Sequence, residues 1–540
     1  MAHTRLVLGD AARGKVLAGA TLLADAVRVT LGPKSKSILI EKPWGSPLVC
    51  NDGVTIAKQV DLEDPDENLG ARLLREAAVR TGDAVGDGTT TSTIVAHAIV
   101  AEGIRNVVAG ASAVDLKRGV DRGVRAAVEA LKARSRPVAG RQETVHVATI
   151  SAHNDPSIGE LVAQAMDRVG SEGVVSLEES KGTETSVEVV EGMQFDHGYL
   201  SPYFVTSPER SEAVLEGALV LLVEQKISTL EEFLPLLEQT VKAARPLLIV
   251  AEDVDGAALA TLVVNKLRGT LACVAVKAPG FGDRRKEMLK DLAIVTGGSV
   301  VSEDLGLKLA NVKLADLGTA KRVVVNGEST TVIGGGGAKG AIEGRAAELR
   351  RAVDKSTSEY DTEKLRERLA KLSGGVALIR VGAPSEAAMK SRKEAFEDAI
   401  SATKAAVAEG IVPGGGLALL RAIPAVEAAA AACEGDERVG VRILRRALEG
   451  PVRQIARNSG FDEGVVLGRL RDATDDTGFD AAKGEYVNLF AAGIIDPTKV
   501  VRIALENAAS VAGVLLLTEG TLTEVPEKKD APRPGGREFD

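Results

Sequence analysis

The hydrophobic pattern changes along the chain in a nearly symmetric order: helical, mixed, alternating α/β, mixed and helical. Residues 1–134 and 410–525 carry amphipathic helix patterns, whereas residues 192–375 carry apolar runs that alternate with helix patterns. Segments of mixed character, 135–191 and 376–409, lie between them. Because an inserted domain interrupts its host in sequence but not in space, this order predicts insertions nested in one helical domain.

The length supports a division into several domains. Single cores stop growing at about 250–300 residues, so a chain of 540 residues is expected to form about three to four domain-sized units. Breaks in the periodicity predict paired hinges, Pro137 with Gly410 and Gly192 with Gly375. The polar, proline-rich residues 526–540 predict a disordered tail.

The middle segment is predicted to form an α/β sheet. Continuous apolar runs at Leu219–Leu222, Leu247–Val250 and Cys273–Val276 are typical of buried parallel strands. Residues 323–333 predict a hairpin with an Asn-Gly turn. The glycines of 334–337 predict a flexible loop, because no Lys-Ser/Thr pair follows them as it would in a P-loop.

Charge and apolar patterning exclude several classes of partner. The formal net charge is −9 and the chain has no Lys/Arg-rich block, which argues against nucleic acid or an anionic membrane as the main partner. The N-terminus lacks the apolar region of a secretory signal, and no apolar run approaches the ~18 residues of a membrane span. These features predict a cytoplasmic protein without a membrane anchor.

Cysteine and histidine usage predicts neither a disulfide framework nor a metal site built on these residues. Cys50, Cys273 and Cys433 are far apart and lack metal-ligand spacing, as expected of isolated thiols in a reducing compartment. The histidines are dispersed too: His3, His97, His146, His153 and His197. The single tryptophan, Trp44, is expected to anchor packing or a loop.

The residues Gly86–Thr91 read Gly-Asp-Gly-Thr-Thr-Thr and precede a helix pattern. Glycines let the backbone approach a ligand closely, and a helix N-terminus favours anions, so this stretch suits phosphate. Asp87 would repel a bare polyphosphate, which predicts a divalent cation between them, since Mg²⁺ is held by one or two carboxylates plus phosphate oxygens. Taken alone, the motif also fits a glycine turn capped by threonines.

Several separate motifs closely resemble the bacterial group I chaperonin family, GroEL type, in order over about residues 5–525. The motifs are Val29–Lys34, Gly86–Thr91, Glu191–Asp196, Gly198–Phe204, Lys277–Lys286, Gly414–Gly416 and Asp496–Lys499. One such motif would be weak evidence, but all of them in order leave little room for chance.

The resemblance implies a multidomain α and α/β fold. An all-helical equatorial domain would comprise 1–134 and 410–525, a small intermediate domain 135–191 and 376–409, and an α/β apical domain 192–375. It also implies a homo-oligomer of two stacked heptameric rings, which captures unfolded client proteins and encapsulates them under a co-chaperonin of the GroES type. ATP and Mg²⁺, with K⁺ as a further ion, would be its cofactors, and ATP hydrolysis its enzymatic activity.

The resemblance also implies roles for single residues around the nucleotide. Asp87 would hold Mg²⁺, and Asp398, with Asp52 nearby, would orient the attacking water, a division of labour that suits phosphoryl transfer. The remaining contacts would be Thr30, Leu31, Gly32, Pro33, Gly88, Thr89, Thr90, Thr91, Gly415, Asp480, Ala481, Ala482 and Asp496. Asp496 would contact the ribose.

A second set of residues matches the family's surface for clients and co-chaperonin. It comprises Tyr199, Tyr203, Phe204, Leu234, Leu237, Leu259, Val263 and Val264. By pattern alone, Ala257–Val264 reads as a buried core helix, because it is apolar on nearly every side. The resemblance implies instead that some of these side chains form an exposed apolar groove.

A few positions depart from the family pattern. Asn51 and Gly327 stand where lysine is usual, Asp480 where asparagine is usual, and Ala408 where an acidic residue is usual. Without a lysine at 327, a restraining contact to Asp83 is not expected, and the usual Gly-Gly-Met tail is absent. These departures leave open an alternative function, a chaperonin-fold paralogue acting mainly as a binding or scaffold protein with weak or no ring cycling.

Overall fold

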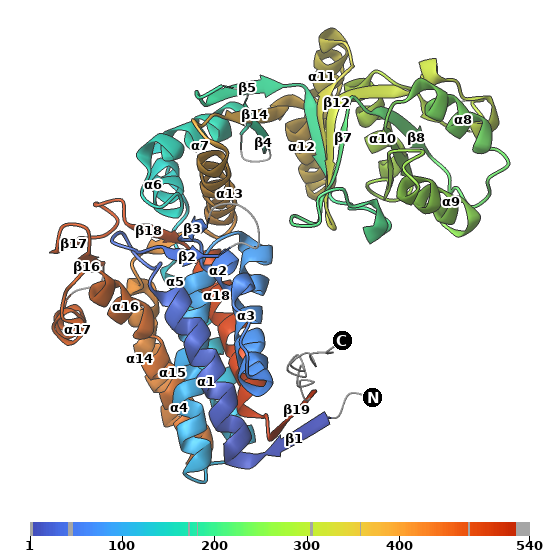
Figure 1. Cartoon of the computed structure of the whole chain (residues 1–540). Coiled ribbons are helices and arrows are strands. Elements are labelled where there is room, and N and C mark those ends of the chain that lie inside the picture. Colours follow the sequence, from blue (N-terminus) through green and yellow to red (C-terminus); the bar gives the residue numbers. More distant parts are fainter. Residues whose placement is uncertain are drawn as a thin grey trace, which may run out of the picture. The chain divides into compact units, whose positions relative to one another are not determined.

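The computed structural model divides into two compact units, Met1–Val162 with Glu394–Asp540, and Ala163–Lys393. Figure 1 gives the labels of the helices and strands. The structure describes residues 4–41, 47–170, 173–180, 182–302, 306–356, 358–473 and 476–524. His3, Trp44 and the predicted tail 526–540 lie outside these ranges. The predicted hinges and the three-part division into domains remain predictions.

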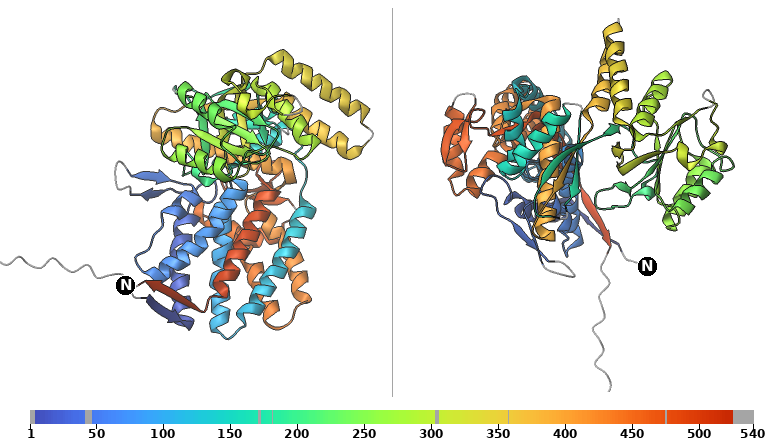
Figure 2. Two further views of the ribbon diagram at one scale, coloured as in Figure 1. Left: turned by 90° about the vertical axis from the view of Figure 1, so that its right-hand side faces the viewer. Right: turned by 90° about the horizontal axis from the view of Figure 1, so that it is seen from above.

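The first unit is a helical bundle. The last helix, α18, packs against α3, α4 and α5, and α1 packs against α3 and α4 (Figure 2). The helices wholly in this unit are α1 (Gly9–Arg28), α2 (Gly53–Gln59), α3 (Pro65–Val85), α4 (Thr89–Val108), α5 (Ala113–Arg134), α6 (Arg141–Ser151), α14 (Leu417–Ala431), α15 (Gly435–Ala447), α16 (Gly450–Asn458), α17 (Glu463–Asp472) and α18 (Thr498–Leu516). The helix α13 (Glu386–Glu409) contributes its residues from 394 onward.

Local sequence signals explain where these helices begin and end. The Asp64 carboxylate caps α3 by accepting hydrogen bonds from the N–H groups of Asp66 and Glu67, with Pro65 at the first helical position. At the other end, α3 stops at Gly86, whose φ of 72° lies in the left-handed region that glycine adopts without cost. Gly86, the residue at which α3 ends, is also the first residue of the motif Gly86–Thr91.

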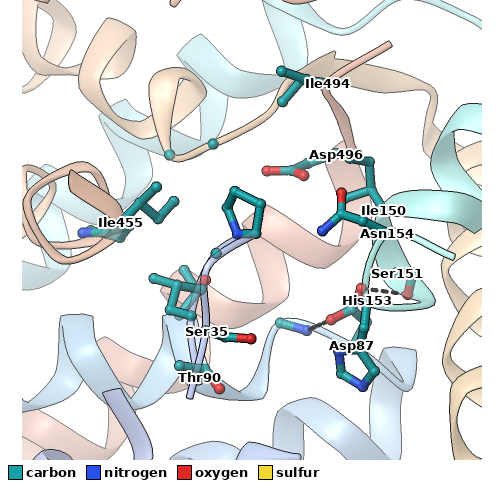
Figure 3. A pocket seen from close by; sticks show the side chains of 18 of the residues that line it. Ser35, Asp87, Thr90, Ile150, Ser151, His153, Asn154, Ile455, Ile494 and Asp496 are labelled. Carbon is teal, nitrogen blue, oxygen red and sulfur yellow. Dashed lines mark hydrogen bonds between the residues drawn. The ribbon is translucent and has the colours of Figure 1, made fainter. Parts of the chain in front are cut away.

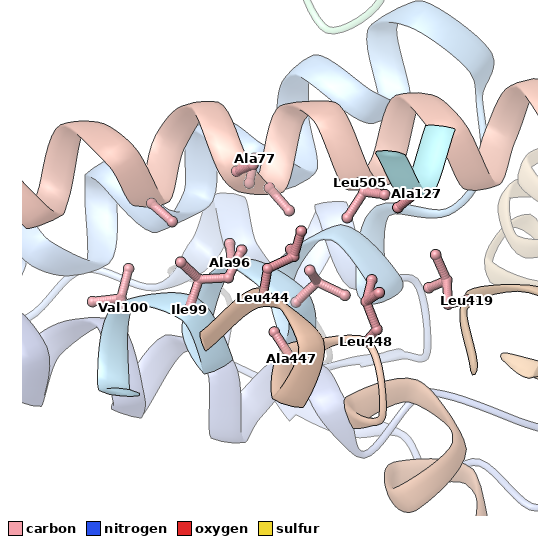
Figure 4. Close-up of a cluster of buried hydrophobic side chains, with 14 of the residues drawn as sticks. Ala77, Ala96, Ile99, Val100, Ala127, Leu419, Leu444, Ala447, Leu448 and Leu505 are labelled. Atoms are coloured by element: carbon pink, nitrogen blue, oxygen red, sulfur yellow. The ribbon is translucent and has the colours of Figure 1, made fainter. Parts of the chain in front are cut away.

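The bundle core consists mainly of alanine, valine and leucine side chains (Figure 4). At two helix contacts glycine replaces a side chain altogether. A Cβ at Gly19 of α1 would lie 1.7 Å from the carbonyl oxygen of Glu67, and one at Gly119 of α5 would lie 2.0 Å from that of Glu437. The helices therefore approach backbone to backbone, which dispersion favours because many atoms are in contact.

Short strand pairs accompany the bundle, so the block predicted to be all helical is not entirely so. The pairs are β1 (Thr4–Leu8) with β19 (Gly520–Glu524), β2 (Ile38–Ile40) with β3 (Leu48–Cys50), β15 (Ile411–Pro413) with β18 (Ile495–Pro497), and β16 (Thr477–Asp480) with β17 (Glu485–Asn488). The sequence itself predicts β2 and β3, since short apolar runs at residues 37–40 and 47–50 read as strands and the second leads into a turn. The other strands are too short to carry a resolvable two-residue period, so helical periodicity does not reveal them. Two of them, β16 and β18, carry predicted site residues.

The second unit contains, in its described part, an eight-stranded mixed sheet in the order β10-β9-β8-β12-β13-β6, with β11 beside β8 and β7 beside β12. The strands are β6 (Gly192–Phe195), β7 (Ala213–Glu216), β8 (Leu219–Val223), β9 (Leu247–Ala251), β10 (Cys273–Lys277), β11 (Val300–Val301), β12 (Gly318–Val325) and β13 (Thr330–Gly335). As predicted, β8, β9 and β10 are parallel and buried.

Helices and a second sheet complete this unit. The helices wholly in it are α8 (Leu234–Ala243), α9 (Gly256–Leu267), α10 (Asp283–Thr296), α11 (Lys339–Lys355) and α12 (Glu359–Gly374), with the short η1 (Pro202–Phe204), η3 (Leu309–Asn311) and η4 (Leu314–Asp316). The strands β4 (Val174–Glu179), β14 (Val376–Val381) and β5 (Ser186–Val190) form the second sheet in that order. The helix α7 (Pro156–Val169) crosses the boundary between the units.

The hairpin β12–β13 is confirmed, but the glycine run after it is not a free loop. Gly334 and Gly335 belong to β13 and donate hydrogen bonds to the carbonyl of Glu191. A Cβ at Gly337 would lie 1.9 Å from the carbonyl oxygen of Ile294 in α10. These glycines are needed because the backbone passes against a helix, so the prediction of a flexible loop was wrong.

The glycine contact between α1 and α3 gives a first prediction. Gly19→Ala should lower the free energy of unfolding by about 3 kcal/mol or more, because overpacking against backbone cannot be relieved by a rotamer change. Gly14→Ala is the matched control on the same helix, since nothing lies within 4 Å of a Cβ there. The control should instead gain up to about 1 kcal/mol from helix propensity. Denaturant unfolding checks both, and equal effects of the two variants would contradict the packing argument.

Candidate functional site

A cavity of about 480 Å³ lies in the helical unit, where loops from several helices converge (Figure 3). Every residue predicted for the nucleotide site lines it. These residues are Thr30, Leu31, Gly32, Pro33, Asp52, Asp87, Gly88, Thr89, Thr90, Thr91, Asp398, Gly415, Asp480, Ala481, Ala482 and Asp496. Side chains up to several hundred positions apart in sequence thus share one surface.

The Gly-Asp-Gly turn joins α3 to α4. Gly86 and Gly88 both have left-handed backbone conformations, with φ of 72° and 78°. Gly88 is the N-cap residue of α4 and offers no side-chain cap, so the first N–H groups of the helix remain available. With Thr89, Thr90 and Thr91 lining the cavity, the positive end of a 20-residue helix meets it, an arrangement that attracts phosphate.

Hydroxyl groups tie this turn to the loop after α1. The Thr30 hydroxyl donates to the carbonyl of Val27 at 2.9 Å, so in its 3.1 Å contact with the Thr90 hydroxyl it accepts. Gly53 lies against the same threonine, because a Cβ there would be 2.3 Å from Thr90 Oγ1. The phosphate motif is therefore held by two other loops and is not an isolated capped turn.

Asp87 has partners on both carboxylate oxygens. The N–H of Gly88 donates to Oδ1, and the Ser151 hydroxyl donates to Oδ2 at 2.7 Å (Figure 3). Ser151 ends α6 and was missed in the sequence, where nothing distinguishes it from other helical serines. His153 and Asn154, which follow it, have left-handed conformations and line the cavity as well.

Asp52 combines two structural tasks. Its carboxylate caps α2 by accepting hydrogen bonds from the N–H groups of Val54 at 3.3 Å and Thr55 at 2.8 Å. The same residue lines the cavity. Capping fixes the carboxylate in one orientation, as a group that positions water or metal requires.

Five aspartates line the cavity, and burial and neighbouring charges raise the pKa of two of them. Burial raises the pKa of Asp496 to about 7, and the charge of Asp87 adds to the shift. Burial also raises the pKa of Asp398 well above its usual range, and the charges of Asp87 and Asp52 raise it further. Among the described lining residues only Lys483 is a lysine or arginine, and it pairs with Asp480 at 3.7 Å. This excess of negative charge suits a bound cation.

A tight turn around Asp480 forms another part of the cavity wall. Asp480 is nearly buried, and its Oδ1 accepts hydrogen bonds from the N–H groups of Ala482 at 3.0 Å and Lys483 at 3.2 Å. An asparagine oxygen would accept the same bonds, so the departure from the family pattern preserves the turn. Apolar side chains that line the cavity include Ile150, Ile455 and Ile494 (Figure 3).

The second unit holds the residues predicted to bind clients. Tyr203 is 63% exposed, Leu234 47% and Val264 43%. Tyr199, Leu259 and Val263 are partly buried. Phe204 and Leu237 are instead buried in the core, where they support this surface but do not form it.

The helix α9 is amphipathic in place, although its sequence is apolar on nearly every side. Ala258 and Leu262 face the core, whereas Val264 and Leu267 are exposed. The Lys266 ammonium donates to the carbonyl of Val205 at 2.7 Å, which fixes α9 beside η1. Leu267 and Val241 of α8 are exposed apolar side chains as well, and neither was among the predicted residues.

The chain is similar to known proteins over nearly its whole length. A profile of the TCP-1/cpn60 chaperonin family matches residues 23–526. Chaperonin GroEL 5 of Bradyrhizobium diazoefficiens is 65% identical to the chain over 529 residues, which cover 98% of each sequence. In the part of the chain that the structure describes, we find no helix long and apolar enough to span a membrane.

The close approach of Gly53 to Thr90 gives a second prediction. Gly53→Ala should weaken nucleotide affinity about 10-fold or more, because a Cβ at this position displaces the Thr90 hydroxyl from the cavity wall. Its backbone conformation permits alanine, so strain does not confuse the result. Gly468→Ala in α17, with nothing within 4 Å of its Cβ, is the control. Calorimetric titration with nucleotide measures both, and unchanged affinity in Gly53→Ala would count against the predicted role of this wall.

Proposed function

Because this chain belongs to the TCP-1/cpn60 chaperonin family, as a bacterial group I chaperonin of the GroEL type, we propose that the cavity is its ATP site and that the apolar surface of the second unit captures clients. The protein is an ATP-dependent chaperonin with ATPase activity, which promotes the folding of other proteins. The observation that carries the site assignment is the convergence of all the predicted nucleotide residues on one cavity.

At the phosphate end, the backbone of Gly88 and the first turn of α4 bind the phosphate oxygens. Asp87 holds Mg²⁺, with Ser151 fixing the orientation of its carboxylate, and K⁺ is a further ion that an acidic cavity would accept. Bound Mg²⁺ supplies positive charge that neutralises the phosphates. The crowding of carboxylates around Asp87 supports a cation at this point.

Asp398 orients the attacking water, and Asp52 assists it. Asp398 is partly accessible from the cavity, and it comes from α13, not from the turn that binds phosphate. A residue placed in this way contacts the nucleophile and not the ground-state nucleotide. Phosphoryl transfer depends mainly on such positioning and on electrostatic stabilisation, because no covalent intermediate is needed.

At the nucleoside end, Gly415 and Asp496 contact the nucleoside, with Asp496 at the ribose. A Cβ at Gly414 would lie 2.9 Å from Asp496 Oδ1, so glycine is needed for β15 and β18 to pair closely. Asp480, Ala481 and Ala482 form the turn beside the adenine. Their geometry is compatible with adenine recognition through backbone and carboxylate groups.

The exposed side chains of Tyr203, Leu234 and Val264 bind apolar segments of unfolded proteins, and a co-chaperonin loop of the GroES type competes for them. Exposed apolar side chains on η1, α8 and α9 suit an extended or helical apolar segment. The assembly is a homo-oligomer of two stacked heptameric rings in the cytoplasm. The alternative, a scaffold without ring cycling, is not favoured, because the carboxylates for hydrolysis all line one cavity.

The separate origins of Asp398 and Asp87 predict different mutant phenotypes. Asp398→Ala should leave ATP affinity largely intact and lower turnover about 100-fold or more, because a water-orienting group acts only in the transition state. Asp87→Ala should weaken Mg²⁺-dependent ATP binding as well, because it removes a metal ligand. Single-turnover hydrolysis and calorimetric titration separate the two effects.

Asp25→Ala is the matched control, since Asp25 is exposed on α1 and pairs with Arg28 away from the cavity. It should hydrolyse ATP at the wild-type rate. Equal losses of affinity and turnover in Asp398→Ala would remove the water-orienting role from this residue.

The exposed tyrosine in the second unit gives a prediction about clients. Tyr203→Glu should abolish capture of a denatured client and spare basal ATPase activity, because a carboxylate placed in an apolar contact loses hydration without gaining a partner. Tyr360→Glu is the control, because Tyr360 is 56% exposed but lies on α12 beneath Arg284. Aggregation of the client, with and without chaperonin, is the readout. Wild-type capture by Tyr203→Glu would refute the assignment.

A further inference from the structure

One face of α13 lies against the turn that precedes the phosphate-binding helix. Asp398, Ser401 and Ala405 are spaced by three and four residues, so they project from the same side of the helix. Ala405 packs in a small apolar cluster with Val85, the last residue of α3, and with Val500 of α18. Asp398, at the other end of this face, lines the cavity.

Ser401 sits directly against Gly86. A Cβ at Gly86 would lie 2.4 Å from Ser401 Cβ and 2.6 Å from Ser401 Oγ. The helix α13 can therefore approach the turn at Gly86 this closely because position 86 has no side chain and position 401 has a small one. Ser401 does not line the cavity, so it has no contact with a nucleotide there.

The C-terminal end of α13 is pinned. Both carboxylate oxygens of Glu409 accept hydrogen bonds from the Arg502 guanidinium of α18, at 3.0 and 2.6 Å. With a rise of about 1.5 Å per residue, Ser401 lies about 12 Å and Asp398 about 16 Å from this point. A displacement of the helix at Ser401 is therefore enlarged at Asp398.

We propose that Ser401 and Gly86 form a spacer that sets how far Asp398 enters the cavity, so that side-chain size at position 401 controls turnover without contact to the nucleotide. The inference rests on the proposed role of Asp398. Ser401 is thus a positioning residue and not a catalytic one. Misplacement of a catalytic group by about 1 Å can cost on the order of 100-fold in rate, so a larger side chain here has a measurable effect.

The test compares side chains of increasing size at one position in the full-length, assembled protein. Ser401→Val and Ser401→Leu should lower the single-turnover rate of ATP hydrolysis about 10-fold and 100-fold, with the dissociation constant for ATP within about 3-fold of wild type. Ser401→Ala, which keeps the Cβ and adds no bulk, should hydrolyse ATP at about the wild-type rate. Ala408→Leu, at an exposed position of the same helix, is the control for added bulk.

Each outcome decides the inference. A rate unchanged in Ser401→Leu, or a parallel loss of affinity and rate, would overturn it. Failure of both the valine and the leucine variants to assemble would also overturn it, because the contact would then serve packing of the whole unit. Asp398→Ala, measured alongside, separates the two proposals. If it retains turnover, the role of Asp398 is wrong, whereas its loss together with a fully active Ser401→Leu would reject the spacer alone.

Discussion

Backbone approach at glycine is the constraint on which the helical unit depends. At Gly19 and Gly119 two helices meet with no side chain between them, whereas at Gly53 and Gly86 the missing side chain leaves room for those of Thr90 and Ser401. Interiors are close-packed and respond to single methyl groups, so these positions fix helix spacing to within a fraction of an ångström. The many alanines among the leucines and valines of this core fit such geometry, because a methyl group fills the narrow space between closely spaced helices.

The turn between α3 and α4 could be predicted because its signal is local. Gly86–Thr91 contains the turn, the carboxylate and the helix start within six positions, and each has a separate physical reason. The parallel strands β8, β9 and β10 were predictable for a similar reason, since burial on both faces removes polar positions from the sequence. Asp398 and Asp496 were assigned by family resemblance, because nothing near them in sequence indicates phosphate chemistry.

What the sequence could not predict depends on contacts between distant segments. Ser151 and Ser401 are ordinary helical serines until folding brings them against Asp87 and Gly86, more than sixty and three hundred positions away. The glycines of β13 suggested flexibility, yet they are confined between a strand and α10. Among the residues predicted to bind clients, Phe204 and Leu237 are as apolar as the rest, but only the fold determines which of these side chains reach solvent.

The position of α13 reflects two opposing effects on Asp398. When Asp398 enters the cavity, its carboxyl group approaches Asp87 and Asp52. Burial and the negative charges of these two residues both oppose ionisation of Asp398. Close packing of Ser401 on Gly86 and of Ala405 on Val85 favours the same position. The cation proposed at Asp87 would reduce the repulsion and so stabilise the docked helix, and by thermodynamic reciprocity the docked helix would strengthen cation binding. Packing and charge thus act on the same short face of α13. They couple the occupancy of the cavity to the position of this helix.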